Sequence, residues 1–153
     1  MDRVIPLDLS RLTVRELNHY LHHELPNNGA VRVEILNPNG QHSLAVGLDA
    51  PAEIDILGHA GYFIAGMNKQ ANITVHGNVG WSVAENIMSG TVRVKGCASE
   101  CAGASGHGEA VLTVGIENLD PHRAVVGQFV MQELIQLAHR QAAQVERDDT
   151  VHE

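Results

Sequence analysis

The sequence predicts a mainly β protein folded as a parallel β-helix, because three observations coincide. Eleven of its 15 glycines lie between Gly58 and Gly115. Within that stretch a short alternating run recurs every 19 residues and ends each time in glycine: IDILG, ITVHG, VRVKG and VLTVG. Apolar residues make up 44% of the chain but aromatic residues only 3%, so Val, Ile, Leu and Ala must build the core. One such coil cannot bury its apolar side alone, so neighbouring coils must stack on it.

The glycines of the repeat mark the points where the chain should turn. Four of them recur at intervals of 19 residues, and two more keep that interval three residues later. Glycine adopts positive φ without steric cost, so we expect these residues at the corners of the coils. The expected corners are Gly58, Gly61, Gly77, Gly80, Gly96 and Gly115. About three to four coils of 19 residues fit into residues 51–118.

The last copy of the repeat differs from the others on its outward side. When Val111 is aligned with Val92, Leu112 and Val114 take the outward positions of the strand. Outward strand positions alternate with inward ones, and in the earlier copies they are mostly polar. Two outward apolar residues therefore predict that another segment of the chain, or a partner, covers this coil.

Residues 1–50 predict a cap on the first coil, made of a helix and a β-hairpin. Thr13 and Glu16 fit a capping box, and the helix should end before Pro26. Apolar residues alternate over residues 31–35 and 44–48, on either side of the turn sequence NPNG, which predicts the hairpin. An open end of a β-helix exposes unpaired backbone groups, so a cap is needed there.

The pattern becomes helical after the repeats. Asp120 and Pro121 fit the N-cap and first turn of a helix. We therefore expect a long amphipathic helix over residues 119–147 and a charged tail over residues 148–153. The apolar side of this helix, a possible interface, contains Val126, Phe129, Val130, Leu134 and Leu137.

Charge and hydropathy exclude several classes of partner. The formal net charge is -8 and no basic cluster is present, so binding to nucleic acid or to an acidic membrane surface is not expected. The sequence contains no run of 18 apolar residues and does not begin like a signal peptide. We therefore expect a cytoplasmic protein.

The repeat region also resembles a known family. Residues 14–109 are similar to the glycine-rich (GXGXG) β-helix domain at the C-terminus of the glutamate synthase large subunit, most specifically in AGMN (residues 65–68) and AENIMSG (residues 84–90). They resemble still more the small β-helix subunit of N-methylglutamate synthase and other glutamate-synthase-like complexes. The resemblance implies a right-handed coil, a direction that the repeat pattern alone does not give.

The resemblance also implies a role. Such a subunit is a non-catalytic scaffold that holds an amidotransferase-like subunit and an FMN-binding synthase-like subunit, which carries FMN and the iron–sulfur cluster. The β-helix subunit itself binds no cofactor. This chain departs from the family pattern because a helix is predicted from about residue 120, where relatives continue with further coils.

Several residues are candidates for chemistry or binding. His19, His22 and His23 have a spacing that could place two imidazoles on one metal ion, although a solvated helix face explains them equally. Cys97 and Cys101 lack the two-residue spacer of redox and zinc motifs, so we expect small space-filling residues at coil corners. Tyr62 and Trp81 occupy one column of successive coils and form either an exposed interaction patch or part of the core. No catalytic residue is predicted.

Three functional hypotheses follow from these observations. The first is the non-catalytic scaffold subunit of a glutamate-synthase-like enzyme. The second is a free-standing homo-oligomeric module for binding or assembly, with coil ends and the face from Val126 to Ala138 buried between protomers. The third is a small metal protein that uses the histidine cluster.

Overall fold

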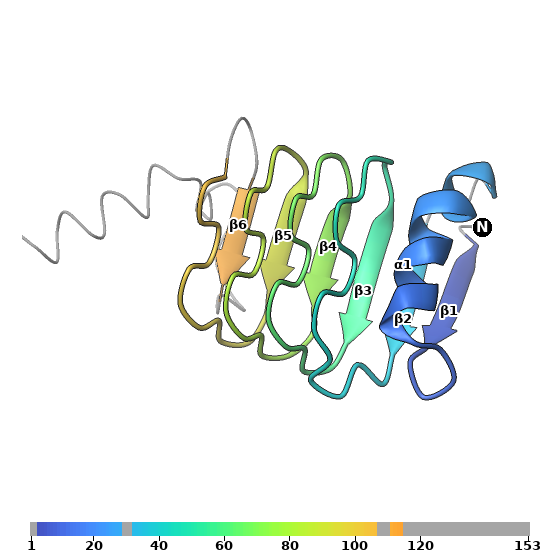
Figure 1. The fold of residues 1–153 in the computed structure, drawn as a ribbon, viewed down its shortest axis with the longest axis horizontal. Coiled ribbons are helices and arrows are strands. Elements are labelled where there is room, and N and C mark those ends of the chain that lie inside the picture. The colour runs from blue at the N-terminus through green and yellow to red at the C-terminus, as the bar shows by residue number, and fades with distance from the viewer. Residues whose placement is uncertain (1–2, 29–31, 107–110, 115–153) are drawn as a thin grey trace, which may run out of the picture.

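The computed structural model describes residues 3–28, 32–106 and 111–114, and it shows a parallel β-helix (Figure 1). Six strands form one sheet in chain order, and each pairs in parallel with the next. The strands are β1 (Val4–Asp8), β2 (Arg32–Leu36), β3 (Glu53–Leu57), β4 (Asn72–Val75), β5 (Thr91–Val94) and β6 (Val111–Val114). The predicted fold class, with one strand in each coil, is confirmed.

The 19-residue register holds for the central coils and fails at β6. Ile54 pairs with Ile73, and Ile73 with Val92, as the repeat predicts. Val92, however, pairs with Leu112 and not with Val111. Because side chains alternate along a strand, this shift of one residue turns Leu112 inward, where it is 5% exposed. The prediction that Leu112 and Val114 face outward is wrong, since Val114 also packs against the core.

The predicted β-hairpin is also wrong. β2 pairs in parallel with β1 on one side and with β3 on the other, and β1 was not predicted at all. Residues 44–48 form turns on the opposite side of the coil. The sheet therefore runs without a break across residue 50.

The side of the coil opposite the sheet is built from five-residue arcs at 43–47, 63–67, 82–86 and 101–105. In each arc the first, third and fifth residues have φ between 53° and 67°. Alternation of left- and right-handed backbone has a period of two, so a strand-like sequence pattern arises without a strand. The left-handed residues are Ser43, Ala45 and Gly47, then Phe63, Ala65 and Met67, then Ser82, Ala84 and Asn86, then Cys101, Gly103 and Ser105.

Backbone hydrogen bonds join each arc to the arcs before and after it. Phe63 N–H donates to the Trp81 carbonyl of the next coil at 2.8 Å, and Met67 N–H donates to the Glu85 carbonyl at 2.8 Å. In the opposite direction, Ala84 N–H donates to the Ile64 carbonyl at 2.8 Å. The arcs are therefore held together by a ladder of bonds, as the strands are.

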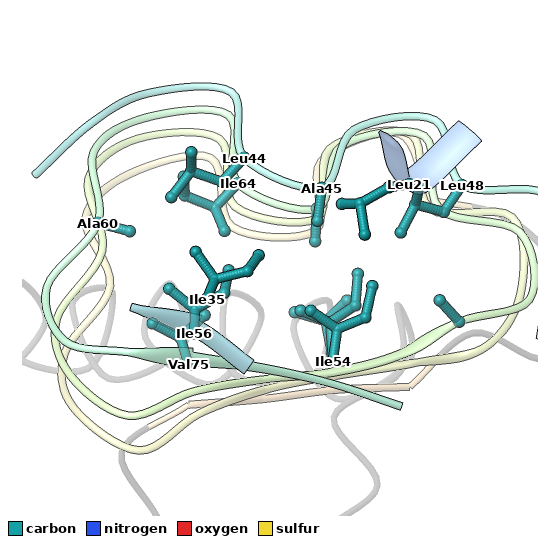
Figure 2. Close-up of a cluster of buried hydrophobic side chains, with 14 of the residues drawn as sticks. Leu21, Ile35, Leu44, Ala45, Leu48, Ile54, Ile56, Ala60, Ile64 and Val75 are labelled. Carbon is teal, nitrogen blue, oxygen red and sulfur yellow. The ribbon is translucent and has the colours of Figure 1, made fainter. Parts of the chain in front are cut away.

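The core lies between the sheet and the arcs (Figure 2). Ile54 and Ile56 point into it from the strand side, while Leu44 and Ile64 point into it from the arc side. These four side chains are at most 1% exposed. Successive coils overlay one another in Figure 2, so each apolar column runs along the stack.

Most of the repeat glycines are required for a reason other than the predicted one. Gly58 has positive φ (143°), but Gly61, Gly77, Gly80 and Gly96 do not. A Cβ on Gly77 would lie 2.7 Å from the carbonyl carbon and oxygen of Gly58. These glycines are needed because adjacent coils approach too closely for any side chain. Gly115 lies outside the described residues.

The helix α1 (Val14–His23) takes the place of an arc in the first coil, between β1 and β2, and is followed by the 3-10 helix η1 (Leu25–Asn27). It begins with the predicted capping box, since Thr13 Oγ1 accepts from Glu16 N–H and Glu16 Oε2 accepts from Thr13 N–H. Leu17 and Leu21 are buried against the core. The predicted helix over residues 119–147 and the tail lie outside the described residues.

No helix within the described ranges is both long enough and apolar enough to cross a membrane.

Candidate docking surface

The large apolar side chains that remain exposed gather on the arc side of two successive coils. Of the six in the described residues, Tyr62, Met67, Trp81 and Met88 lie in or beside the second and third arcs. Trp81 is 64% exposed and Tyr62 is 49% exposed. We call these four residues the arc patch. Large exposed apolar groups that cluster on one surface indicate a site of protein interaction.

Tyr62 and Trp81 belong to one column that begins with His42. Ser43 N–H donates to the Tyr62 carbonyl and Phe63 N–H donates to the Trp81 carbonyl, which places both aromatic residues at the same point of successive coils. The His42 ring stacks on Tyr62 with centroids 3.8 Å apart and accepts from Tyr62 N–H through Nδ1 at 3.0 Å. The structure brings the predicted pair Tyr62 and Trp81 together on the surface.

The surroundings of the arc patch carry negative charge. Glu100 follows Trp81 in the same column, and Glu85 lies in the third arc. Within the described part of the chain, neither carboxylate takes part in a salt bridge. The nearby Asp49 does, because Lys69 Nζ donates to it at 3.1 Å, and this bond together with that from Gln70 lowers the pKa of Asp49.

The histidines of α1 do not form a metal site of three ligands. The His19 and His23 rings lie 4.5 Å apart, but His22 Nε2 lies 2.7 Å from the Val46 carbonyl oxygen. A carbonyl oxygen only accepts, so Nε2 carries the proton and cannot bind a metal. Over residues 3–28, 32–106 and 111–114, no three His, Cys, Asp or Glu side chains are grouped closely enough to hold an ion.

His22 and Asn18 instead tie α1 to the first arc. The Asn18 side-chain amide donates to the Ser43 carbonyl at 2.8 Å. In the inner coils, the carbonyl equivalent to that of Val46 accepts an N–H from the preceding coil, as Gly66 does from Gly47. His22 supplies that hydrogen bond where no preceding arc exists. These two side chains therefore cap the stack, a role that the sequence pattern did not reveal.

The cysteines lie on the surface and do not fill space. Cys97 and Cys101 are both free and exposed, so the expectation of buried corner residues is wrong. Cys97 ends a column in which side chains accept N–H groups of the next coil. His59 Nδ1 accepts from Asn78 N–H, and Asn78 Oδ1 accepts from Cys97 N–H, each at 2.9 Å.

A second cluster, on the outward face of the sheet, was missed by the sequence analysis. Asp55 is only 9% exposed although it points outward, because Arg32 and His76 cover it. Its carboxylate lies 2.8 Å from Arg32 and 2.6 Å from His76 Nε2. The three residues come from neighbouring strands at different columns, so only the 19-to-21-residue register could have revealed them.

The chain is similar to Protein GlxC of Rhizobium meliloti (strain 1021). The two are 44% identical over 86 residues, a match that covers 56% of this chain and 38% of that protein. The chain thus spans well under half the length of the relative. No protein-family model matches the chain, and no solved structure does.

The match to Protein GlxC must include part of both described surfaces. Any continuous stretch of 86 residues in a chain of 153 contains residues 68–86. Trp81 of the arc patch and His76 of the sheet cluster therefore lie within the matched stretch. Of the other predicted interface residues, Leu112 belongs to the core, and Val126, Phe129, Val130, Leu134 and Leu137 lie outside the described residues.

Proposed function

We propose that this protein is a non-catalytic scaffold subunit of a glutamate-synthase-like enzyme of the N-methylglutamate synthase type, and that it acts in the cytoplasm. The observation that carries the proposal is the arc patch, an exposed apolar surface on a rigid stack. The similarity to Protein GlxC and the family resemblance of residues 14–109 support the class of complex.

The proposed role of the stack is to fix the position of a surface. Tyr62 is held by the His42 ring and by backbone bonds to both neighbouring coils, so its side chain loses little freedom on binding. Trp81, the single tryptophan, adds the largest apolar area of the patch. Tryptophan and tyrosine are the residues most enriched among the strong contacts of interfaces.

The proposed partners are an amidotransferase-like subunit and an FMN-binding synthase-like subunit. In this proposal FMN and the iron–sulfur cluster belong to the partner, and this chain holds neither. The carboxylates of Glu85 and Glu100 beside the patch favour a partner surface that is apolar at its centre and basic at its rim.

Copurification tests the proposal. The tagged chain, expressed with the genes that neighbour it, should retain a flavoprotein with bound FMN. The double variant Tyr62→Ser and Trp81→Ser should lose at least about tenfold of that flavin, since truncation of such contacts costs about 2 kcal/mol or more each. Leu57→Ser is the matched control, because Leu57 is exposed on the sheet side.

The outcomes separate the parts of the proposal. If the wild-type chain retains no flavoprotein, the subunit role is wrong. If the double variant retains as much flavin as Leu57→Ser, the subunit role stands and the arc patch is not the docking surface.

A further inference from the structure

The outward face of the sheet carries opposite charges at its two ends. β2 and β3 place Glu34, Glu53 and Asp55 on this face with one cation, Arg32, which leaves a formal charge of -2. Two strands further along, β5 and the residue that follows it contribute Arg93 and Lys95, a formal charge of +2.

Some of these groups already have partners within the chain. Asp55 is paired with Arg32 and His76, and the Asn72 side-chain amide donates to Glu53 at 2.6 Å. Across the part of the chain that the structure describes, Glu34, Arg93 and Lys95 make no salt bridge.

Distance prevents the remaining charges from pairing inside one molecule. Glu34 and Arg93 stand in the same column, with Asp55 and Thr74 between them. Three strand spacings of about 4.8 Å separate them, roughly 14 Å in total, which exceeds the reach of an ion pair. A molecule with the reverse order of charge would satisfy both ends at once.

We propose that this face binds a second copy of the chain, with the two stacks antiparallel. A two-fold axis that runs along the strand direction, between β3 and β4, brings β2 of one copy opposite β5 of the other. Because the axis preserves the columns, Glu34 then faces Arg93 of the second copy, twice in the dimer. Leu57, which is 38% exposed, is covered by the second copy's His76 region. An interface of this kind uses the same patch on both copies.

The size of the face sets the strength of the contact. Four strands of four or five residues cover roughly 300–400 Å² on each copy, given spacings of about 4.8 Å between strands and about 3.3 Å between residues. The total is below the range of stable complexes, so the dimer is weak. Its charge pairs lie at the edge of the contact, so salt should dissociate it.

Charge reversal tests the proposal on the full chain without partners. Sedimentation should show association at about 20 mM salt that is lost at about 500 mM. Glu34→Arg and Arg93→Glu should each weaken the dimer about tenfold or more. The double variant should return to within about threefold of the wild type, because each reversed charge again meets its opposite. Glu85→Arg, on the arc side, is the control and should retain the dimer.

Other variants guard against loss of folding. Glu34 is half-buried, so Glu34→Gln, which removes only the charge, should also weaken association while the circular dichroism spectrum stays that of the wild type. A chain that stays monomeric at low salt, or a double variant no better than either single variant, would overturn the proposal. Neither result bears on the arc patch, which lies on the other side of the coil and is tested by flavoprotein copurification.

Discussion

The two sides of each coil show two ways to stack the same backbone. On the sheet side, β-branched residues adopt the strand conformation that they favour, and parallel pairing joins one coil to the next. On the arc side, ten residues other than glycine adopt the left-handed conformation at alternate positions. Each of these costs about 1–2 kcal/mol in isolation. The strands are therefore favoured locally, whereas the arcs persist because hydrogen bonds and packing from both neighbouring coils hold them.

The largest expected effect comes from the corner where the two sides meet. Gly77→Val should destabilise the protein by about 3 kcal/mol or more, because its side chain would collide with the backbone of Gly58 and His59. Gly40 provides the contrast, since it has φ of 71° and open space around it. Gly40→Asn should change stability by less than about 1 kcal/mol, because asparagine tolerates this conformation. Urea unfolding measures both; similar small losses would show that the coils can separate to make room.

A smaller effect should change sign between the two sides. Cys101→Gly should stabilise the protein by about 0.5–1 kcal/mol, because Cys101 is exposed and has φ of 60°. Arg93→Gly, at an exposed strand position, should destabilise it by about 1 kcal/mol. Thermal melting at high salt, where association is suppressed, compares the two variants. Destabilisation by both would contradict the strained character of the arcs.

The smallest effect concerns pH and the arc side. Hydrogen bonds from Lys69 and Gln70 lower the pKa of Asp49 and so link one coil to the next. A carboxyl with a lowered folded pKa contributes stability that is complete above its unfolded pKa, about 3.9, and is lost as pH falls through the folded value. The wild type should therefore be slightly more stable than Asp49→Asn at pH 7 and equal to it at about pH 2. A difference that persists in acid would mean that the charge of Asp49 is not its source.

The sheet side could be predicted from the sequence and the arc side could not. Ile54, Ile73 and Val92 align by simple counting because strands of equal length repeat at equal spacing. Leu112 was misplaced because one additional residue between β5 and β6 reverses every side chain after it. Residues 44–48 were taken for a strand because left- and right-handed residues alternate with the same period as a strand.

The candidate surfaces show the same division. Tyr62 and Trp81 were placed in one column by the repeat, and the structure shows both exposed. The Arg32, Asp55 and His76 cluster joins different columns of three strands, so its detection needed the exact spacing of coils that differ in length. His22 and Asn18 act at the end of the stack, where no repeat exists to reveal their role.

The fluorescence of Trp81 tests the central claim most directly, because this is the single tryptophan and it lies in the arc patch. The free chain should show the red-shifted emission of an exposed indole and strong quenching by acrylamide. Addition of the copurified flavoprotein, under conditions in which a complex forms, should shift the emission to the blue and reduce the quenching several-fold. A complex that forms while Trp81 remains as accessible as in the free chain would contradict the assignment of the arc patch as the docking surface.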